Sequence, residues 1–184
     1  MRVVAGSARG RRLKELPGMD TRPTTDKVKE SMFNIVQFEV EGRRVLDLFG
    51  GTGQLGIEAL SRGAARCTFV DAARPAVAVI RENLRALGFE DRAEVRQQDA
   101  EAFLSSCRER YDLILMDPPY VSELLERCIQ AISRFDILAE HGIIICESAA
   151  DKQIGFAPSL CGNSREYRYG KIKLTVCRRQ ESDE

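Results

Sequence analysis

The chain has 184 residues, of which 43% are hydrophobic and 7% aromatic, and its 28 basic residues balance 28 acidic ones. This length and composition indicate one ordinary folded domain and exclude disordered and collagen-like chains. The apolar runs are much shorter than the roughly 20 residues that cross a bilayer. The basic N-terminus lacks the apolar stretch of a secretory signal, so we expect a cytoplasmic protein that does not bind membranes.

The first 40 residues predict a basic N-terminal extension without a core of its own. Two short runs, Arg2–Val4 and Arg12–Lys14, are joined through glycines and are typical of a small β-hairpin. The apolar residues within Val28–Val36 then follow helical spacing, which predicts a helix. We therefore divide the chain into an extension that contacts the substrate, residues 1–40, and a main domain, residues 41–184.

From residue 43 onward, short apolar β-type runs alternate with stretches of helical period. This pattern is typical of β-α-β units in a parallel sheet. The predicted strands are Val45–Phe49, Cys67–Asp71, Ala93–Gln97, Leu113–Asp117 and Ile143–Glu147. Helical spacing also predicts a helix that ends at Gly88 and another that precedes the fifth strand.

Two alternating runs flank Tyr169-Gly170-Lys171 near the end of the chain and predict a closing hairpin. Together these elements predict an α/β fold with a doubly wound, mostly parallel, Rossmann-like sheet. A C-terminal antiparallel hairpin completes it, and the small β-hairpin and helix precede it.

The six cysteines lie at least 15 residues apart and form no Cys-x-x-Cys pair. The sequence therefore predicts no metal site and no redox motif. Most of the cysteines fall inside apolar segments, so we expect small buried side chains in a protein from a reducing compartment.

A glycine-rich turn follows the first predicted strand and opens a helix. Gly51, Gly53 and Gly56 satisfy the pattern G-x-G-x-x-G, whose glycines permit a tight turn and a close approach to a ligand. Asp71 ends the second strand twenty residues after Gly51, where a carboxylate can accept hydrogen bonds from a ribose diol. At this point a nicotinamide dinucleotide and S-adenosylmethionine fit equally well.

Two further acids favour S-adenosylmethionine. Asp47 precedes the turn, where a carboxylate repels a pyrophosphate but can hold the ammonium of a methionine moiety. Asp99 follows the third strand and lies at the same edge of the sheet. An acidic site suits a cofactor that carries both a sulfonium and an ammonium.

The run Asp117-Pro118-Pro119-Tyr120 ends the fourth predicted strand. Two consecutive prolines fix the backbone and remove the N–H groups that would extend a strand. The turn presents the Asp117 carboxylate, the Pro118 carbonyl and the Tyr120 ring to the predicted crevice. Two acceptors can hold the N–H protons of an exocyclic amine and direct its lone pair to a methyl group, while the ring stacks on the base.

These motifs resemble those of class I S-adenosylmethionine-dependent methyltransferases, and more closely those of the RsmD-type family of bacterial 16S rRNA (guanine-N2)-methyltransferases. The likeness covers RVVAGSARGRRL, RPTTDKVKE, LDLFGGTGQLGIEALSRGA and DPPY. RPTTDKVKE is much more specific to the family than the glycine-rich turn and DPPY, which occur across many amino-methyltransferases. The resemblance implies a cytosolic enzyme that methylates N2 of one guanine, position 966 in the usual 16S numbering. Its partner would be 16S rRNA within the small ribosomal subunit or its assembly intermediate.

By position, the resemblance assigns two groups of residues to the reaction. The cofactor-binding residues are Asp47, Phe49, Gly50, Gly51, Thr52, Gly53, Gly56, Asp71, Asp99 and Ala100. The catalytic residues are Asp117, Pro118, Pro119 and Tyr120.

The zero net charge hides an uneven distribution. Residues 1–44 hold ten basic and six acidic residues, residues 45–164 twelve and eighteen, and residues 165–179 six and one. An acidic body therefore lies between two basic ends, and we expect these ends to bind RNA phosphates. The expected RNA-binding residues are Arg2, Arg9, Arg11, Arg12 and Arg22.

Other functions share parts of this pattern. DNA adenine-N6 methylation uses the same turn chemistry, although 184 residues leave no separate target-recognition domain. A nicotinamide-dependent oxidoreductase shares the glycine-rich turn, and a non-catalytic RNA-binding or ribosome-assembly factor could retain the fold alone. For the enzyme we expect a monomer.

Overall fold

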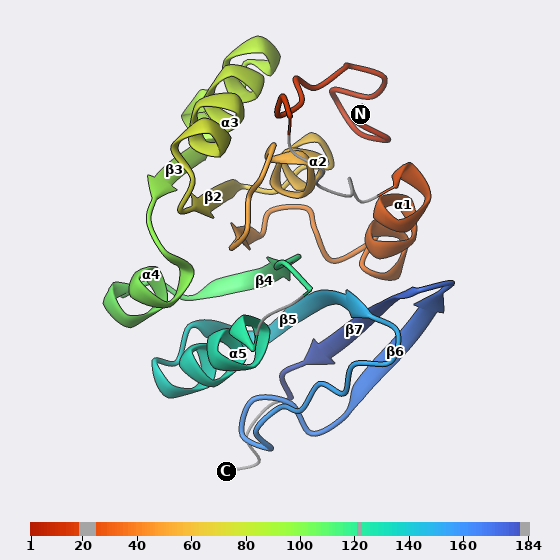
Figure 1. The fold of residues 1–184 in the computed structure, drawn as a ribbon, viewed down its shortest axis with the longest axis vertical. Helices are drawn as coiled ribbons and strands as arrows, with labels where there is room; N and C mark the ends of the chain where they lie inside the picture. The colour runs from red at the N-terminus through yellow and green to blue at the C-terminus, as the bar shows by residue number, and fades with distance from the viewer. Residues whose placement is uncertain (19–24, 121–122, 181–184) are drawn as a thin grey trace.

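The structure, a computed structural model, describes residues 1–18, 25–120 and 123–180. A seven-stranded sheet forms its centre, in the order β3-β2-β1-β4-β5-β7-β6 (Figure 1). The strands are β1 (Arg44–Asp47), β2 (Arg66–Asp71), β3 (Ala93–Gln97), β4 (Tyr111–Met116), β5 (Leu138–Ala149), β6 (Ser164–Tyr169) and β7 (Ile172–Arg178). The helices are α1 (Asp26–Ile35), α2 (Gln54–Ser61), α3 (Arg74–Leu87), the 3-10 turn η1 (Glu90–Arg92), α4 (Ala100–Ser106) and α5 (Leu124–Arg134).

The first five strands pair in parallel, and β7 pairs antiparallel with both β5 and β6. The predicted α/β fold, with its mostly parallel sheet and C-terminal antiparallel hairpin, is confirmed. Gly88 ends α3 in the left-handed conformation, as predicted. The strand ends differ from prediction, because β1 stops at Asp47, β4 stops at Met116, and β5 begins at Leu138 rather than Ile143.

Alternate side chains of the central strands enter two cores on opposite faces of the sheet. Val45 and Leu113 pack with α1, α2 and α3, whereas Leu46 and Ile114 pack with α4 and α5. Figure 1 shows these two groups of helices on either side of the sheet. Burial on both faces explains why the strands read as nearly continuous apolar runs.

The predicted N-terminal β-hairpin is short: its two runs meet at an antiparallel bridge between Arg2 and Arg12, and the N–H of Val3 donates to the carbonyl of Arg11 at 2.9 Å. The backbone N–H groups of Val4 and Ala5 instead donate to the Glu58 carboxylate on α2, each at 2.9 Å. A side chain of the main domain thus takes the hydrogen bonds that a longer ladder would use. Apolar residues of this segment join the core formed with α1, α2 and α3.

All six cysteines are free, and five of them are buried. Burial raises the pKa of the Cys67 and Cys146 thiols well above the usual range, so they act as small apolar side chains. Among the helices that the structure describes, none combines the length and the hydrophobicity that a membrane crossing needs.

Candidate active site

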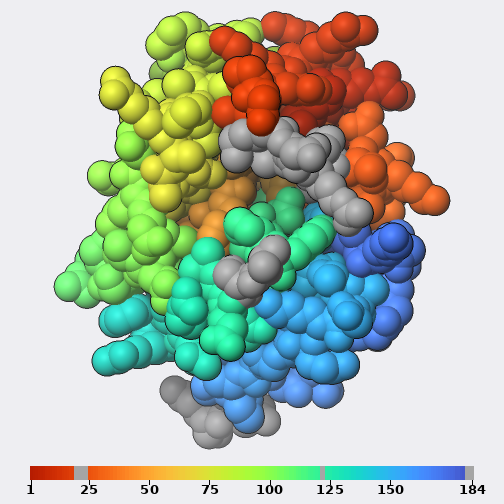
Figure 2. Space-filling view, in the orientation of Figure 1, coloured from red at the N-terminus to blue at the C-terminus, as the bar shows by residue number. Residues whose placement is uncertain are grey.

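A cavity of about 600 Å³ opens at the carboxyl ends of β1, β2, β3 and β4. In doubly wound sheets, ligands bind at this edge. Figure 2 shows the surface hollowed here, between the N-terminal segment and the residues that follow β4. Four consecutive loops of the sheet thus contribute to one site.

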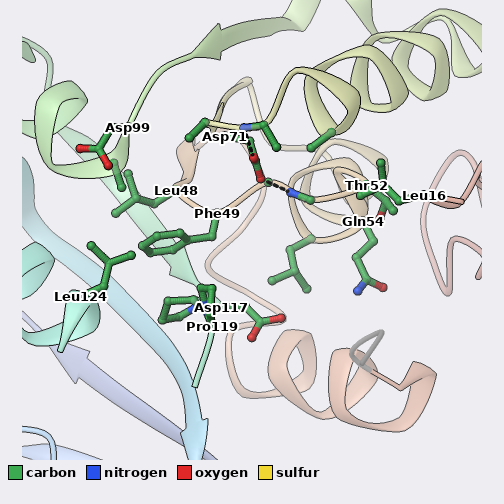
Figure 3. Close-up of a pocket in the computed structure, with 18 of the residues that line it drawn as sticks. Leu16, Leu48, Phe49, Thr52, Gln54, Asp71, Asp99, Asp117, Pro119 and Leu124 are labelled. Carbon is green, nitrogen blue, oxygen red and sulfur yellow. Dashed lines mark hydrogen bonds between the residues drawn. The ribbon is translucent and has the colours of Figure 1, made fainter. Parts of the chain in front are cut away.

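Of the residues predicted to bind the cofactor or to act in catalysis, eleven line this cavity and three do not. The lining residues are Phe49, Gly50, Gly51, Thr52, Asp71, Asp99, Ala100, Asp117, Pro118, Pro119 and Tyr120. The other three, Asp47, Gly53 and Gly56, are buried and do not line the cavity. The two motifs found in the sequence therefore open into the same space (Figure 3).

The glycine-rich turn is held by the acid that ends β2. Gly51 has a φ of +57° and donates its N–H to Asp71 Oδ2 at 2.9 Å. The other oxygen, Asp71 Oδ1, accepts from the N–H of Ala73 at 2.8 Å, at the start of α3. Gly56 has a packing role, because a Cβ there would lie 2.3 Å from the Phe69 ring. Asp71 therefore orients the turn as well as lining the cavity.

Asp47 is buried, with only 1% of its surface exposed. Its Oδ2 accepts from the N–H of Gly56 at 3.0 Å, while Oδ1 has no hydrogen-bond partner among the described residues. Burial, together with the negative charges of Asp117 and Asp71, raises the pKa of Asp47 to about 8. Since Asp47 does not line the cavity, its direct contact with a cofactor ammonium stays a prediction.

Asp99 follows β3 and also lines the cavity. Its Oδ1 accepts from the N–H of Ala102 at 3.0 Å and so caps the first turn of α4. Asp99 is exposed and lies on the same side of the cavity as Asp71 (Figure 3). The two carboxylates, with Asp117, make the cavity acidic, which fits a cationic cofactor such as S-adenosylmethionine.

The turn at residues 117–120 directly follows β4. Asp117 and Tyr120 are half-buried, and Pro118 is buried between them. The Tyr120 hydroxyl donates to Glu147 Oε1 at 2.6 Å, and Glu147, on β5, is only 2% exposed. This hydrogen bond restrains the ring. Glu147 is not among the predicted site residues, although it is an acid at the carboxyl end of a predicted strand.

The N-terminal segment reaches the cavity, because Met1 and Leu16 form part of its wall. A buried ion pair anchors this segment. The Lys29 ammonium on α1 donates to the carbonyl of Arg2 at 2.6 Å and lies 3.8 Å from Glu58, both charged side chains being fully buried. Burial lowers the pKa of Lys29, although Glu58 opposes the change. Neither Lys29 nor Glu58 is among the predicted site residues.

The predicted RNA-binding arginines differ in their surroundings. Arg9 and Arg12 are exposed, and among the described residues no ion pair engages them. Arg2 pairs with Asp26 at 3.3 Å, and Arg11 donates to the carbonyl of Ala86 at 2.8 Å. Arg22 lies outside the described residues.

The basic C-terminal run is largely neutralised within the fold. Lys173 is fully buried and pairs with Glu166 at 2.8 Å. Arg178 pairs with Glu39, and Arg179 pairs with an aspartate before β5 at 2.9 Å. Acidic residues of the same chain thus pair with part of the C-terminal basic run, and phosphate binding by either basic end stays a prediction.

The fold and the site define the class of this protein: it is an S-adenosylmethionine-dependent methyltransferase, with the glycine-rich turn and the DPPY turn opening into one acidic cavity. Residues 1–178 match the family described as conserved hypothetical protein 95. The chain belongs to this family, which is the RsmD family.

Ribosomal RNA small subunit methyltransferase D of Escherichia coli (strain K12) is 31% identical over 100% of this chain and 92% of that protein. The solved structure of Escherichia coli YhhF has a TM-score of 0.89 at 29% identity and covers 99% of both chains. The fold also recurs in a Thermus thermophilus 16S rRNA N2 G1207 methyltransferase, in complex with AdoMet and guanosine. That match has a TM-score of 0.71 at 17% identity and covers 90% of this chain and 46% of the other.

Proposed function

We propose that this protein transfers a methyl group from S-adenosylmethionine to the exocyclic N2 of a guanine in 16S rRNA. The observation that carries the proposal is that the turn at residues 117–120 faces the same cavity as Asp71 and Asp99. The name of the Escherichia coli relative supports a small-subunit rRNA substrate. We further propose that the enzyme acts as a cytoplasmic monomer on the subunit or its assembly intermediate, with residues 1–40 contacting the RNA.

In this mechanism the bound cofactor supplies an electrophilic methyl group on a sulfonium. Asp71 and Asp99 hold the ribose and the surrounding part of the cofactor. The Asp117 carboxylate and the Pro118 carbonyl accept the two N–H groups of the target amine, and the Tyr120 ring stacks on the base. The amine becomes acidic as it gains the methyl group, so the proton passes to Asp117 or water without a strong base.

Transfer of a labelled methyl group tests the proposed function. Unmodified small subunits and free 16S rRNA are incubated separately with the protein, and the products are digested to nucleosides. We expect N2-methylguanosine at one position. Label on another nucleoside, or on neither RNA, would contradict the assignment.

Two controls address the other enzyme classes. Plasmid DNA replaces the subunit in the same assay, and methylated adenine there would favour a DNA methyltransferase. Titration of the protein with NADH tests the oxidoreductase, and tight binding of NADH would overturn our assignment. We expect no methylated DNA and no tight binding of NADH, because the three cavity carboxylates repel a pyrophosphate.

The hydrogen bond between Tyr120 and Glu147 predicts a graded effect of two substitutions. Tyr120→Ala removes the stacking ring, and we expect kcat/KM for the subunit to fall roughly 100-fold. Tyr120→Phe keeps the ring but loses the 2.6 Å hydrogen bond, so we expect a fall of about threefold to tenfold. Steady-state methyl transfer measures both. Equal effects of the two variants would exclude stacking as the main role of Tyr120.

The exposed arginines of the N-terminal segment predict a salt-dependent contact with RNA. We expect Arg9→Ala/Arg12→Ala to weaken subunit binding and to reduce the slope of log K against log salt by roughly 1–2. Filter binding at several salt concentrations measures this slope. The matched control, Arg108→Ala/Arg134→Ala, removes two exposed cations near the amino ends of β4 and β5 and should leave the slope unchanged. Equal slopes for both double variants would refute the contact.

A further inference from the structure

Gln54, the first residue of α2, carries a buried polar atom without a hydrogen-bond partner in the described part of the chain. Its side chain lines the cavity and is only 8% exposed. The carbonyl oxygen Oε1 is buried and has no hydrogen-bond partner among the described residues. A buried acceptor without a partner is destabilising, and in a binding cavity it indicates a ligand that donates a hydrogen bond there.

The position of Gln54 indicates which ligand this is. In Figure 3 the Gln54 amide and the Asp117 carboxylate both project towards the α1 side of the cavity, away from Asp71 and Asp99. The cavity therefore has two parts. Asp71 and Asp99 form the part proposed for the ribose, whereas Asp117 and Gln54 border the part proposed for the reacting amine.

We propose that Gln54 recognises the base, accepting N1–H of the target guanine with Oε1 and donating from its amide nitrogen to O6. Guanine alone among the bases with an exocyclic amine presents a ring N–H beside that amine. Adenine and cytosine present an unprotonated ring nitrogen beside their amine. The acceptor Oε1 of Gln54 would then face another hydrogen-bond acceptor. Gln54 is thus a specificity-determining residue, and this assignment rests on the proposed function.

The two proposed hydrogen bonds of Gln54 make a prediction for a base that keeps the exocyclic amine but lacks N1–H and O6. The base 2-aminopurine carries the reactive amine, lacks O6, and has no proton on N1. Wild-type enzyme should therefore prefer guanine over 2-aminopurine at the target position. Gln54→Met has similar length and no hydrogen-bonding amide, so we expect it to lose most of that preference.

The test uses reconstituted small subunits that carry either guanine or 2-aminopurine at the methylated position. For Gln54→Met we expect kcat/KM on guanine to fall about 10- to 100-fold, with little change on 2-aminopurine. Titration calorimetry should show S-adenosylmethionine affinity within about threefold of wild type. Gln130→Met, at an exposed position on α5, is the matched control and should behave as wild type.

Three outcomes would overturn the assignment. If Gln54→Met keeps the wild-type preference for guanine, the amide does not read the base. If the variant loses cofactor affinity tenfold or more with an unchanged base preference, Oε1 accepts from the cofactor ammonium instead. If the wild-type enzyme methylates no guanine N2, the proposed function fails as well. Urea unfolding checks folding, and we expect Gln54→Met to be at least as stable as wild type because it removes an unsatisfied group.

Discussion

We expect Asp117→Ala to slow methyl transfer by roughly 1,000-fold while S-adenosylmethionine still binds. Asp117 lies at the end of β4, in the wall of the cavity, with two prolines fixing the backbone that follows it. Its carboxylate is the charged one of the two acceptors assigned to the target amine. Removing it leaves the amine lone pair delocalised into the ring, so the loss falls on the chemical step.

The folded state should tolerate this substitution. Asp117 is only half-buried, and its negative charge contributes to the raised pKa of the buried Asp47. Single-turnover methyl transfer and cofactor titration separate chemistry from binding. Asp117→Asn keeps one acceptor oxygen and should retain part of the activity. The control Asp91→Ala, at an exposed site, should retain all of it. Undiminished turnover in Asp117→Ala would refute the mechanism.

The second large effect is expected for Asp47→Asn, which should stabilise the protein at alkaline pH. Burial raises the pKa of Asp47 from 3.8 to about 8. Between these values the folded protein retains a proton that the unfolded chain releases, so the free energy of unfolding falls as pH rises. Each pH unit in this window corresponds to at most about 1.4 kcal/mol for one group. Asparagine has no such proton and can still accept from Gly56.

Urea unfolding at about pH 5 and about pH 8.5 measures this effect. The advantage of Asp47→Asn over wild type should be larger at the higher pH, and Asp91→Asn, at an exposed site, should show no such trend. An advantage that is constant with pH, or larger in acid, would contradict the raised pKa. A bound cofactor ammonium would favour the ionised form of Asp47, a charge that asparagine cannot supply, so we expect S-adenosylmethionine to bind about tenfold more weakly to Asp47→Asn. Unchanged affinity would exclude the predicted role of Asp47 at the ammonium.

Much of the site could be predicted because parallel strands bring their carboxyl ends to one edge. Asp71, Asp99 and Asp117 each follow a strand of the sheet, and all three line the cavity. The same rule failed to predict the burial of Asp47. β1 lies between β2 and β4, and the glycine-rich turn and α2 cover its end. Exposure at the end of a central strand depends on the path of the next turn, which the residue type does not reveal.

The residues that were missed depend on contacts between distant parts of the chain. Glu147 meets Tyr120 across 27 positions because β5 lies beside β4 in the sheet. Gln54 belongs to a short helix whose other residues are mostly apolar. It is distinguished by lining the cavity and by a buried oxygen that has no hydrogen-bond partner among the described residues. The pairing of Lys173 with Glu166 likewise removed a cation that the charge count had assigned to RNA.

By itself the sequence determined the class of protein, because strand and helix periodicity and the two motifs are local patterns. It also determined that the cofactor site is acidic, since the acids follow successive strands. Only the tertiary structure decided which charges remain available, because burial and pairing depend on neighbours that are remote along the chain. Arg9 and Arg12 stay exposed, whereas Lys173 and Asp47 are buried. For the same reason, the buried Gln54 oxygen, which has no hydrogen-bond partner among the described residues, could be recognised only in the folded structure.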